Sequence, residues 1–159
     1  MNCIEVRSTA DMADILHRAS MLYMASNLPI DYGTGEKYTA VEVHMLRYII
    51  DHPDRTVTDL SQSWDRSKAA ISQMLKRMEE KDLVAWREAP DNKKKQLYFA
   101  TAKGMDLHQK HLEYDERVFG GTLELLGEVC SQEEIAICFH VLEAYTQVRP
   151  KKHYQSDVL

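Results

Sequence analysis

The stretch from Ser67 to Met78 constrains the fold of this chain more than any other part of it. The i, i+3, i+4, i+7 spacing of a single buried helix face is met by Ile71, Met74, Leu75 and Met78. The opposite face carries small or polar side chains of the kind that contact base-pair edges, namely Ala69, Ser72, Gln73 and Lys76. The stretch therefore predicts a helix with one face in the core and the other available for reading DNA.

The flanking segments supply the other elements of a winged helix-turn-helix. Thr39 caps a predicted helix that runs to about Asp51, and Thr56 or Thr58 begins a short helix before Ser67 caps the next one. After Leu83 the apolar period changes to two, which predicts a β-hairpin. We expect strands around Val84 and Trp86 and around Leu97 and Phe99, joined by a lysine-rich loop over residues 89–96. We assign Trp64, Trp86 and Phe99 to core or hinge packing.

Further amphipathic helices flank this region on both sides. Ser8 and Asp11 predict the start of a first helix, and a long helix begins at Thr101 and runs towards Leu126, with a kink or loosening expected at Gly120 and Gly121. A last helix follows the Ser131–Glu134 capping box. The apolar stripes of the first and last helices have no partner within the chain, which favours a two-fold homodimer. We place these stripes at Ile15, Leu16 and Leu22 and at Phe139, Leu142 and Tyr145.

The predicted fold class is therefore mainly α with a small β wing, a winged helix-turn-helix flanked by N- and C-terminal dimerisation helices. Within a single structural domain we expect an N-terminal dimerisation helix and loop (1–38), a DNA-binding region (39–100) and C-terminal dimerisation helices with a tail (101–159). The net charge of −5 disfavours a nucleic-acid partner at first sight. However, residues 65–95 hold nine bases and six acids, a local charge of +3 that leaves −8 on the rest of the chain. One basic edge is thus presented by an otherwise acidic molecule.

Several other classes of protein are disfavoured by the sequence. Cys3, Cys130 and Cys138 form no CxxC pair, so we expect reduced thiols in a cytoplasmic protein, with Cys3 inert and not a redox switch. No secretion signal and no apolar run of about 18 residues is present, which predicts no membrane partner. No nucleophile elbow, phosphate loop or carboxylate pair stands out, so we expect neither an enzyme nor a cofactor.

The combined order of motifs resembles the MarR family of bacterial transcription regulators over nearly the whole chain. The matching segments are Tyr38–Leu46, Leu60-Ser61, Met78–Leu83, the wing pattern Arg87-x-x-x-Asp91-x-Lys93, and Thr101-x-x-Gly104. Asp82 and Asp65 stand where the family commonly has glycine, and Lys93 stands where an arginine is typical. The resemblance implies a DNA-binding regulator, which we expect to be a repressor that binds a palindromic operator as a homodimer and is released by a small effector. The expected contacts with double-stranded DNA are Ser67, Lys68, Ala69, Ser72, Gln73, Lys76, Arg87, Lys93, Lys94 and Lys95.

Histidines dominate the expected effector site. We predict that His17, His44, His108 and His111 line a pocket where the flanking helices meet the DNA reader. A small organic effector, often an aromatic acid in the resembled family, is the favoured ligand. We predict no bound metal, although a zinc-responsive regulator remains an alternative with His44, His111 and Asp115 as candidate ligands. Two further hypotheses are a winged-helix module that binds an acidic protein and, less favoured, a metal-dependent enzyme.

Overall fold

The computed structural model describes residues 7–25 and 28–148, and the N-terminal Cys3 and the C-terminal tail lie outside this range. The elements in chain order are α1 (Thr9–Ala25), β1 (Ile30–Asp31), β2 (Lys37–Tyr38), α2 (Ala40–Asp51), α3 (Val57–Ser63), α4 (Lys68–Glu80), β3 (Val84–Ala89), β4 (Asn92–Ala100), α5 (Ala102–Gly127) and α6 (Gln132–Val148). The predicted fold class, mainly helical with a small β wing, is confirmed.

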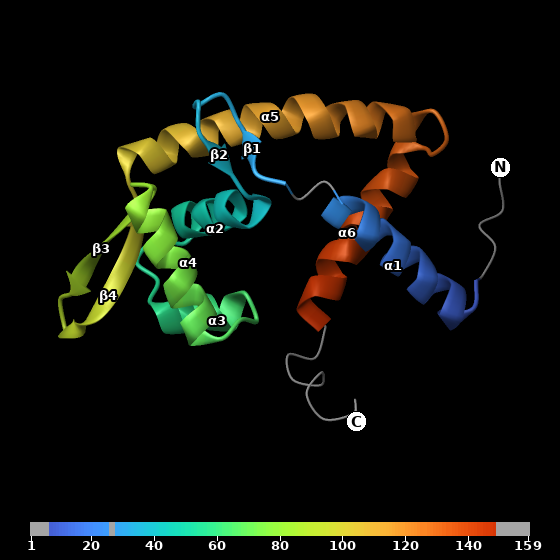
Figure 1. Ribbon diagram of the computed structural model, residues 1–159. Helices are drawn as coiled ribbons and strands as arrows, with labels where there is room; N and C mark the ends of the chain where they lie inside the picture. The colour runs from blue at the N-terminus through green and yellow to red at the C-terminus, as the bar shows by residue number, and fades with distance from the viewer. Residues whose placement is uncertain (1–6, 26–27, 149–159) are drawn as a thin grey trace.

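Figure 1 shows two groups of elements joined by α5. Helices α2, α3 and α4 gather with the β3–β4 hairpin at one end, and we call this group the winged-helix body. Helices α1 and α6 lie at the other end. The short β1–β2 hairpin, which falls largely in the loop expected after the first helix, lies next to α5.

The buried core lies mainly in the winged-helix body. Its members are Tyr32, Tyr38, Val43, Met45, Leu46, Ile49, Leu60, Ile71, Leu75, Met78, Leu83, Val84, Tyr98 and Leu107. Leu107 belongs to the first half of α5, so this helix is anchored in the core at its N-terminal end. By contrast, every described side chain of α1 is exposed, and α6 has no buried residue.

Side chains at the helix starts explain where the helices begin. Thr39 and Thr56 accept hydrogen bonds from the backbone N–H groups of Glu42 and Asp59, whose carboxylates accept from the threonine N–H groups in return. These reciprocal bonds satisfy donors that a helix start leaves unpaired. Thr56 therefore caps α3, which settles the choice between Thr56 and Thr58. Ser131 and Glu134 make the same pair of bonds before α6.

The wing differs from the predicted hairpin. Ala89 pairs with Asn92, so a tight turn at Pro90-Asp91 replaces the expected loop of residues 89–96. Proline and aspartate suit such a turn, and a lysine run gives no period-two apolar signal that would have marked the strand. Lys93, Lys94 and Lys95 consequently belong to β4.

Two predictions about aromatic packing in the wing were wrong. Trp86 and Phe99 are 42% and 36% exposed, whereas Tyr98 is buried at 4% exposure. The strand register places Tyr98 opposite Trp86, and it is Tyr98 that turns towards the core. Trp64, as expected, is partly buried and packs against the core.

Helix α5 also departs from expectation, because it continues through Gly120 and Gly121 without interruption. A β-carbon built at either glycine meets no atom within 4 Å, so neither glycine is required there by a close contact. The winged-helix body and the far end of the molecule are therefore connected by one continuous helix of 26 residues.

Candidate nucleic-acid interface

Helix α4 presents a polar face to solvent. Ser67 caps the helix, since its hydroxyl accepts from the Ala70 N–H at 3.2 Å. Ile71, Leu75 and Met78 are buried, with no detectable exposure, which fixes the rotation of the helix about its axis. The predicted DNA contacts on the other side are all exposed: Ser67, Lys68, Ala69, Ser72, Gln73 and Lys76. One face of α4 is thus held by the core and the other is available to a partner.

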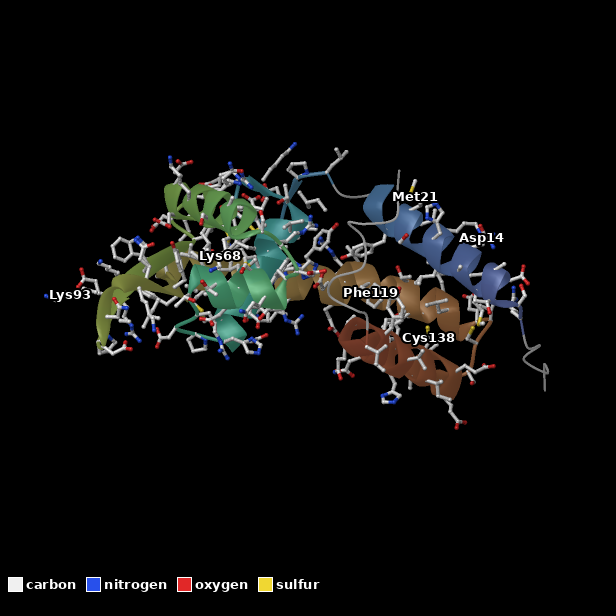
Figure 2. All side chains as sticks on the ribbon, turned by 90° about the horizontal axis from the view of Figure 1, so that it is seen from below. Asp14, Met21, Lys68, Lys93, Phe119 and Cys138 are labelled. Carbon is white, nitrogen blue, oxygen red and sulfur yellow. The ribbon has the colours of Figure 1, made fainter. Side chains whose placement is uncertain are left out.

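The wing adds positive charge to the same end of the molecule. Lys93, Lys94, Lys95 and Arg87 are exposed on the hairpin. Figure 2 shows Lys68 on α4 and Lys93 on the wing at the end opposite Asp14 and Cys138. Lys94, Lys95 and Gln96 line an open cleft of about 450 Å³ together with residues 56–59 at the start of α3. The predicted DNA contacts of α4 and those of the wing therefore lie at the same end of the molecule.

Left-handed backbone conformations set the turns around α4. Asp65, before the helix, has φ +48°, and Asp82, after it, has φ +56°. Aspartate is one of the few residues other than glycine that adopts this conformation readily. Both positions are ones where the resembled family commonly has glycine, the residue that adopts this conformation without a steric penalty. The hydroxyl of Thr101 donates to the Asp82 carbonyl at 2.6 Å and ties the end of α4 to the start of α5.

A partly buried ion pair anchors the C-terminal end of α4 to α2. Lys81, the C-cap of α4, donates to Glu42 Oε1 at 2.6 Å, and Glu42 is only 6% exposed. Burial raises the pKa of Glu42, but the hydrogen bonds from Lys81 and Thr39 outweigh this effect, so the pKa lies below its ordinary value. This pair was not predicted, because its partners are 39 residues apart and no sequence pattern links the two positions.

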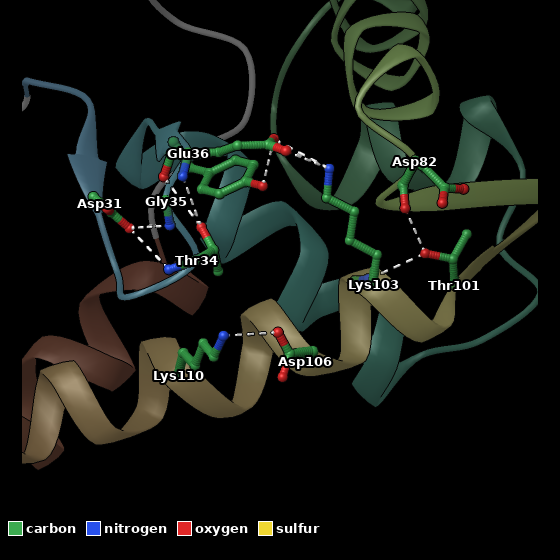
Figure 3. Close-up of polar contacts among 11 residues, drawn as sticks. Asp31, Thr34, Gly35, Glu36, Asp82, Thr101, Lys103, Asp106 and Lys110 are labelled. Carbon is green, nitrogen blue, oxygen red and sulfur yellow. Dashed lines mark hydrogen bonds and ion pairs between the residues drawn. The ribbon is translucent and has the colours of Figure 1, made fainter.

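The β1–β2 hairpin is tied to the first turn of α5 (Figure 3). Lys103 Nζ donates to both carboxylate oxygens of Glu36 at 2.9 and 3.1 Å, and the Tyr38 hydroxyl donates to the same carboxylate at 2.9 Å. The bond from Lys103 is the largest cause of the lowered pKa of Glu36. Within the hairpin loop, Asp31 Oδ1 accepts from the N–H groups of residues 33–35 at 2.8 to 3.1 Å. The β1–β2 hairpin is thereby fixed against the first turn of α5.

A cavity of about 250 Å³ lies between this hairpin, α2 and α5. It is lined by Tyr23, Ile30, Tyr32, Ala40, His44, His111, Tyr114, Asp115, Val118, Phe119 and Thr122. The His44 and His111 rings meet edge to face at 5.1 Å, and His111 Nε2 lies 3.3 Å from Asp115 Oδ2. His111 is 2% exposed, and its Nδ1 has no hydrogen-bond partner among the described residues. Burial is the main cause that lowers the pKa of both imidazoles, although Asp115 acts in the opposite direction.

The four predicted effector histidines do not all meet. His44 and His111 line the cavity together, but His17 is exposed on α1 and His108 is half-buried on α5, and neither lines the cavity. The tyrosines of the cavity were not predicted, because Tyr32 and Tyr114 come from segments without a ligand-binding motif. Among the described residues, no cluster of three or more His, Cys, Asp or Glu side chains is arranged to hold a metal ion. Cys130 and Cys138 are free thiols, and none of the described helices is long and apolar enough to cross a membrane.

The fold and the exposed basic face define a winged helix-turn-helix protein. Residues 37–95 match the sequence model of the MarR family. The winged helix-turn-helix of this chain is therefore similar to that of the MarR family, and the predicted resemblance is confirmed. A curated relative, the uncharacterized HTH-type transcriptional regulator YhjH of Bacillus subtilis (strain 168), is 24% identical over 90 residues, which are 57% of this chain and 51% of that protein. The chain thus spans about half the length of the curated relative that it matches.

Solved structures of similar fold cover most of the chain. Streptococcus pneumoniae FabT in complex with DNA has a TM-score of 0.62 at 19% identity, covering 87% of this chain and 92% of FabT. Wild-type Lactococcus lactis ZitR in complex with DNA has a TM-score of 0.59 at 21% identity, covering 89% and 98%. A further ZitR structure, described as a zinc-responsive MarR family member, gives 0.59 at 19% identity over 88% and 98%. At these identities the likeness concerns the fold.

Proposed function

We propose that this protein is a DNA-binding transcription regulator that acts as a repressor and binds a palindromic operator as a homodimer. The observation that carries the proposal is the exposed face of α4, where Ser72, Gln73 and Lys76 lie opposite an apolar face that is packed in the core. A helix in the major groove reads bases with such side chains, while a basic wing contacts phosphates. The DNA complexes of FabT and ZitR, which share the fold, support this assignment.

The homodimer is supported by the apolar surface at the far end of the molecule. Exposed side chains there include Ile15, Leu16 and Leu22 of α1, Leu125 and Leu126 of α5, and Ile137, Phe139, Leu142 and Tyr145 of α6. An apolar surface of this extent on three helices is typical of a protein interface. A second copy of the chain would cover it and place two α4 helices about one DNA turn apart, roughly 34 Å.

Selection of bound fragments from random duplex DNA tests the proposal. We expect an inverted repeat to emerge, and the affinity for it to fall steeply as the salt concentration rises, because phosphate contacts release counterions. The alternative of a winged-helix module for an acidic protein predicts no enrichment of any duplex. Binding of an acidic protein that specific duplex fails to displace would favour that alternative.

We further propose that the cavity beside His44 and His111 holds a small aromatic effector. Tyr32, Tyr114 and Phe119 line it, and a space of about 250 Å³ suits a single ring with a polar substituent. The ligand would release the DNA by changing the separation of the two α4 helices. A coupling of about 1–3 kcal/mol would be enough to change operator occupancy severalfold to a hundredfold.

Zinc is the alternative effector, since ZitR is described as zinc-responsive and His44, His111 and Asp115 all line the cavity. Titration of the protein–DNA complex with aromatic acids and, separately, with micromolar zinc discriminates the two. If zinc changes the DNA affinity and the His44→Ala and His111→Ala variants lose this response, the metal alternative holds. If aromatic acids release the DNA and zinc has no effect, the hypothesis of an organic effector holds.

A further inference from the structure

Asp54 occupies an unusual position in the turn between α2 and α3. Its backbone has φ +64°, the left-handed region that disfavours most residues with a side chain. Aspartate tolerates this conformation better than most residues, but glycine adopts it without a steric penalty.

The backbone around Asp54 is joined to the wing. The Asp54 N–H donates to the Tyr98 carbonyl at 3.1 Å, and the Tyr98 N–H donates to the Arg55 carbonyl at 3.1 Å. Arg55 thereby forms an antiparallel bridge with Tyr98 of β4. Because Tyr98 is buried, this contact fixes the turn against the base of the hairpin.

The side chain of Asp54 is joined to the other wing strand. Arg87 Nη2 of β3 donates to Asp54 Oδ2 at 2.6 Å. The second carboxylate oxygen, Oδ1, is buried and has no hydrogen-bond partner among the described residues, so the carboxylate is turned with one oxygen inward and the other towards Arg87. The Arg87 side chain is nevertheless 62% exposed. Only one of its two terminal nitrogens is thus used by Asp54, and much of the guanidinium faces solvent.

We propose that Asp54 is a positioning residue, which holds Arg87 so that the outer edge of its guanidinium contacts a DNA phosphate. This inference rests on the proposed function and adds a residue to it. Guanidinium is planar and carries five N–H donors, so it bonds a carboxylate on one edge and a phosphate on the other. An arginine that is already held in place loses less side-chain freedom when DNA binds.

Whether DNA binding weakens or strengthens when the Asp54 charge is removed distinguishes the positioning role of Asp54 from a purely electrostatic repulsion of DNA. Removing a carboxylate near DNA reduces repulsion of the phosphates and should strengthen binding. If Asp54 positions Arg87, removing its charge should instead weaken binding, because Arg87 must then be ordered by the DNA itself. Glu88 provides a matched control, since it is an exposed acidic residue adjacent to Arg87 on the same strand.

The experiment compares the affinities of the full chain and its variants for one selected duplex by fluorescence anisotropy over a series of salt concentrations. We expect Asp54→Asn to weaken binding roughly threefold to tenfold, the factor that corresponds to ordering one long side chain. Glu88→Gln should bind equally well or more tightly. Neither substitution should alter the preference among duplex sequences, because phosphate contacts position the protein without reading bases.

Arg87 variants test whether Asp54 acts through this residue. Arg87→Gln should lower the slope of log affinity against log salt by about 0.9, the loss of one phosphate contact, whereas Asp54→Asn should leave the slope unchanged. Arg87→Lys should also retain the slope but weaken binding, because an ammonium group lacks the planar fork. The double variant Asp54→Asn with Arg87→Gln should bind no more weakly than Arg87→Gln by itself.

Thermal unfolding of each variant verifies the fold, and Asp54→Gly, which suits φ +64° without a side chain, replaces Asp54→Asn if the latter unfolds. Unchanged or tighter binding by the folded Asp54 variant would overturn the inference. Additive losses in the double variant would also overturn it, since Asp54 would then act independently of Arg87. If the wild-type chain binds no duplex even at low salt, the proposed function fails first, and the inference fails with it.

Discussion

Single residues of α4 and the wing are expected to contribute to DNA binding in two distinguishable ways. Ser72→Ala and Gln73→Ala should relax the preference among operator sequences, with a loss of about 1–3 kcal/mol per base contact. Lys94→Ala and Lys95→Ala should weaken binding to all duplexes alike. Affinities for a panel of single-base operator variants measure both effects. A change of base preference in the lysine variants, with none in the α4 variants, would show that the wrong face has been assigned.

The Glu42–Lys81 pair makes a prediction about the pH dependence of stability. Because the pKa of Glu42 in the folded protein lies below its ordinary value, its ionised form stabilises the fold above that ordinary value. This stabilisation is lost as the pH falls through the folded-state pKa. Glu42→Gln should lower the free energy of unfolding at pH 7 by about 1–3 kcal/mol, since it leaves Lys81 without its charged partner.

Urea unfolding of the wild type and of Glu42→Gln at neutral pH and near pH 3 tests this prediction. The difference in unfolding free energy between the two proteins should shrink as the pH falls, because protonated Glu42 resembles glutamine. Glu36→Gln serves as the control, since Glu36 also has a lowered pKa but is far more exposed. An unchanged difference at both pH values would show that the charge of Glu42 does not stabilise the fold.

At the scale of the element, the start of α5 depends on a close approach between backbones. A β-carbon on Gly104 would collide with the Leu83 carbonyl oxygen and lie 3.1 Å from the Leu46 side chain. Gly104→Ala should therefore destabilise the protein by about 1–3 kcal/mol or more, the range seen for overpacked sites. Gly121→Ala on the same helix should leave stability unchanged or raise it by up to about 1 kcal/mol, because open space surrounds this glycine. Thermal unfolding of both variants measures the contrast, and equal destabilisation would contradict it.

The helices and their caps could be predicted from the sequence because their signals are local. Thr39, Thr56 and Ser67 each satisfy a backbone donor three residues ahead, and that spacing is visible in the sequence. The buried face of α4 follows equally directly from its apolar period. The length of β4 could not be predicted, because an exposed strand of lysines carries no such period.

Contacts between distant elements account for what the sequence did not reveal. The pairs Arg87–Asp54 and Lys81–Glu42 join residues 33 and 39 positions apart, and no sequence pattern links the two members of either pair. The cavity depends in the same way on how α2 and α5 are rotated against each other. That rotation places His44 and His111 together and leaves His108 out of the lining. His17 is also absent from the lining, because it lies exposed on α1.

At the scale of the whole molecule, dimerisation and DNA binding should be lost together. Leu142 lies on the exposed apolar face of α6, so Leu142→Asp would place an unpaired charge in the proposed interface at a cost of several kcal/mol. The variant should sediment as a monomer and lose affinity for the inverted repeat, because one half-site binds weakly. Glu143→Asp, a charge-preserving change at the adjacent exposed position, should remain dimeric. A monodisperse wild-type monomer that binds the full operator tightly would contradict this prediction.

The uninterrupted course of α5 joins the two ends of the molecule by one helix. A helix of 26 residues is about 39 Å long, so tilting it by roughly 10° about its outer end displaces the inner end by about 7 Å. The inner end lies in the core that also holds α4. A small change of angle at the far end would thus be converted into a displacement of about two base-pair steps at the DNA, which have a rise of about 3.4 Å each.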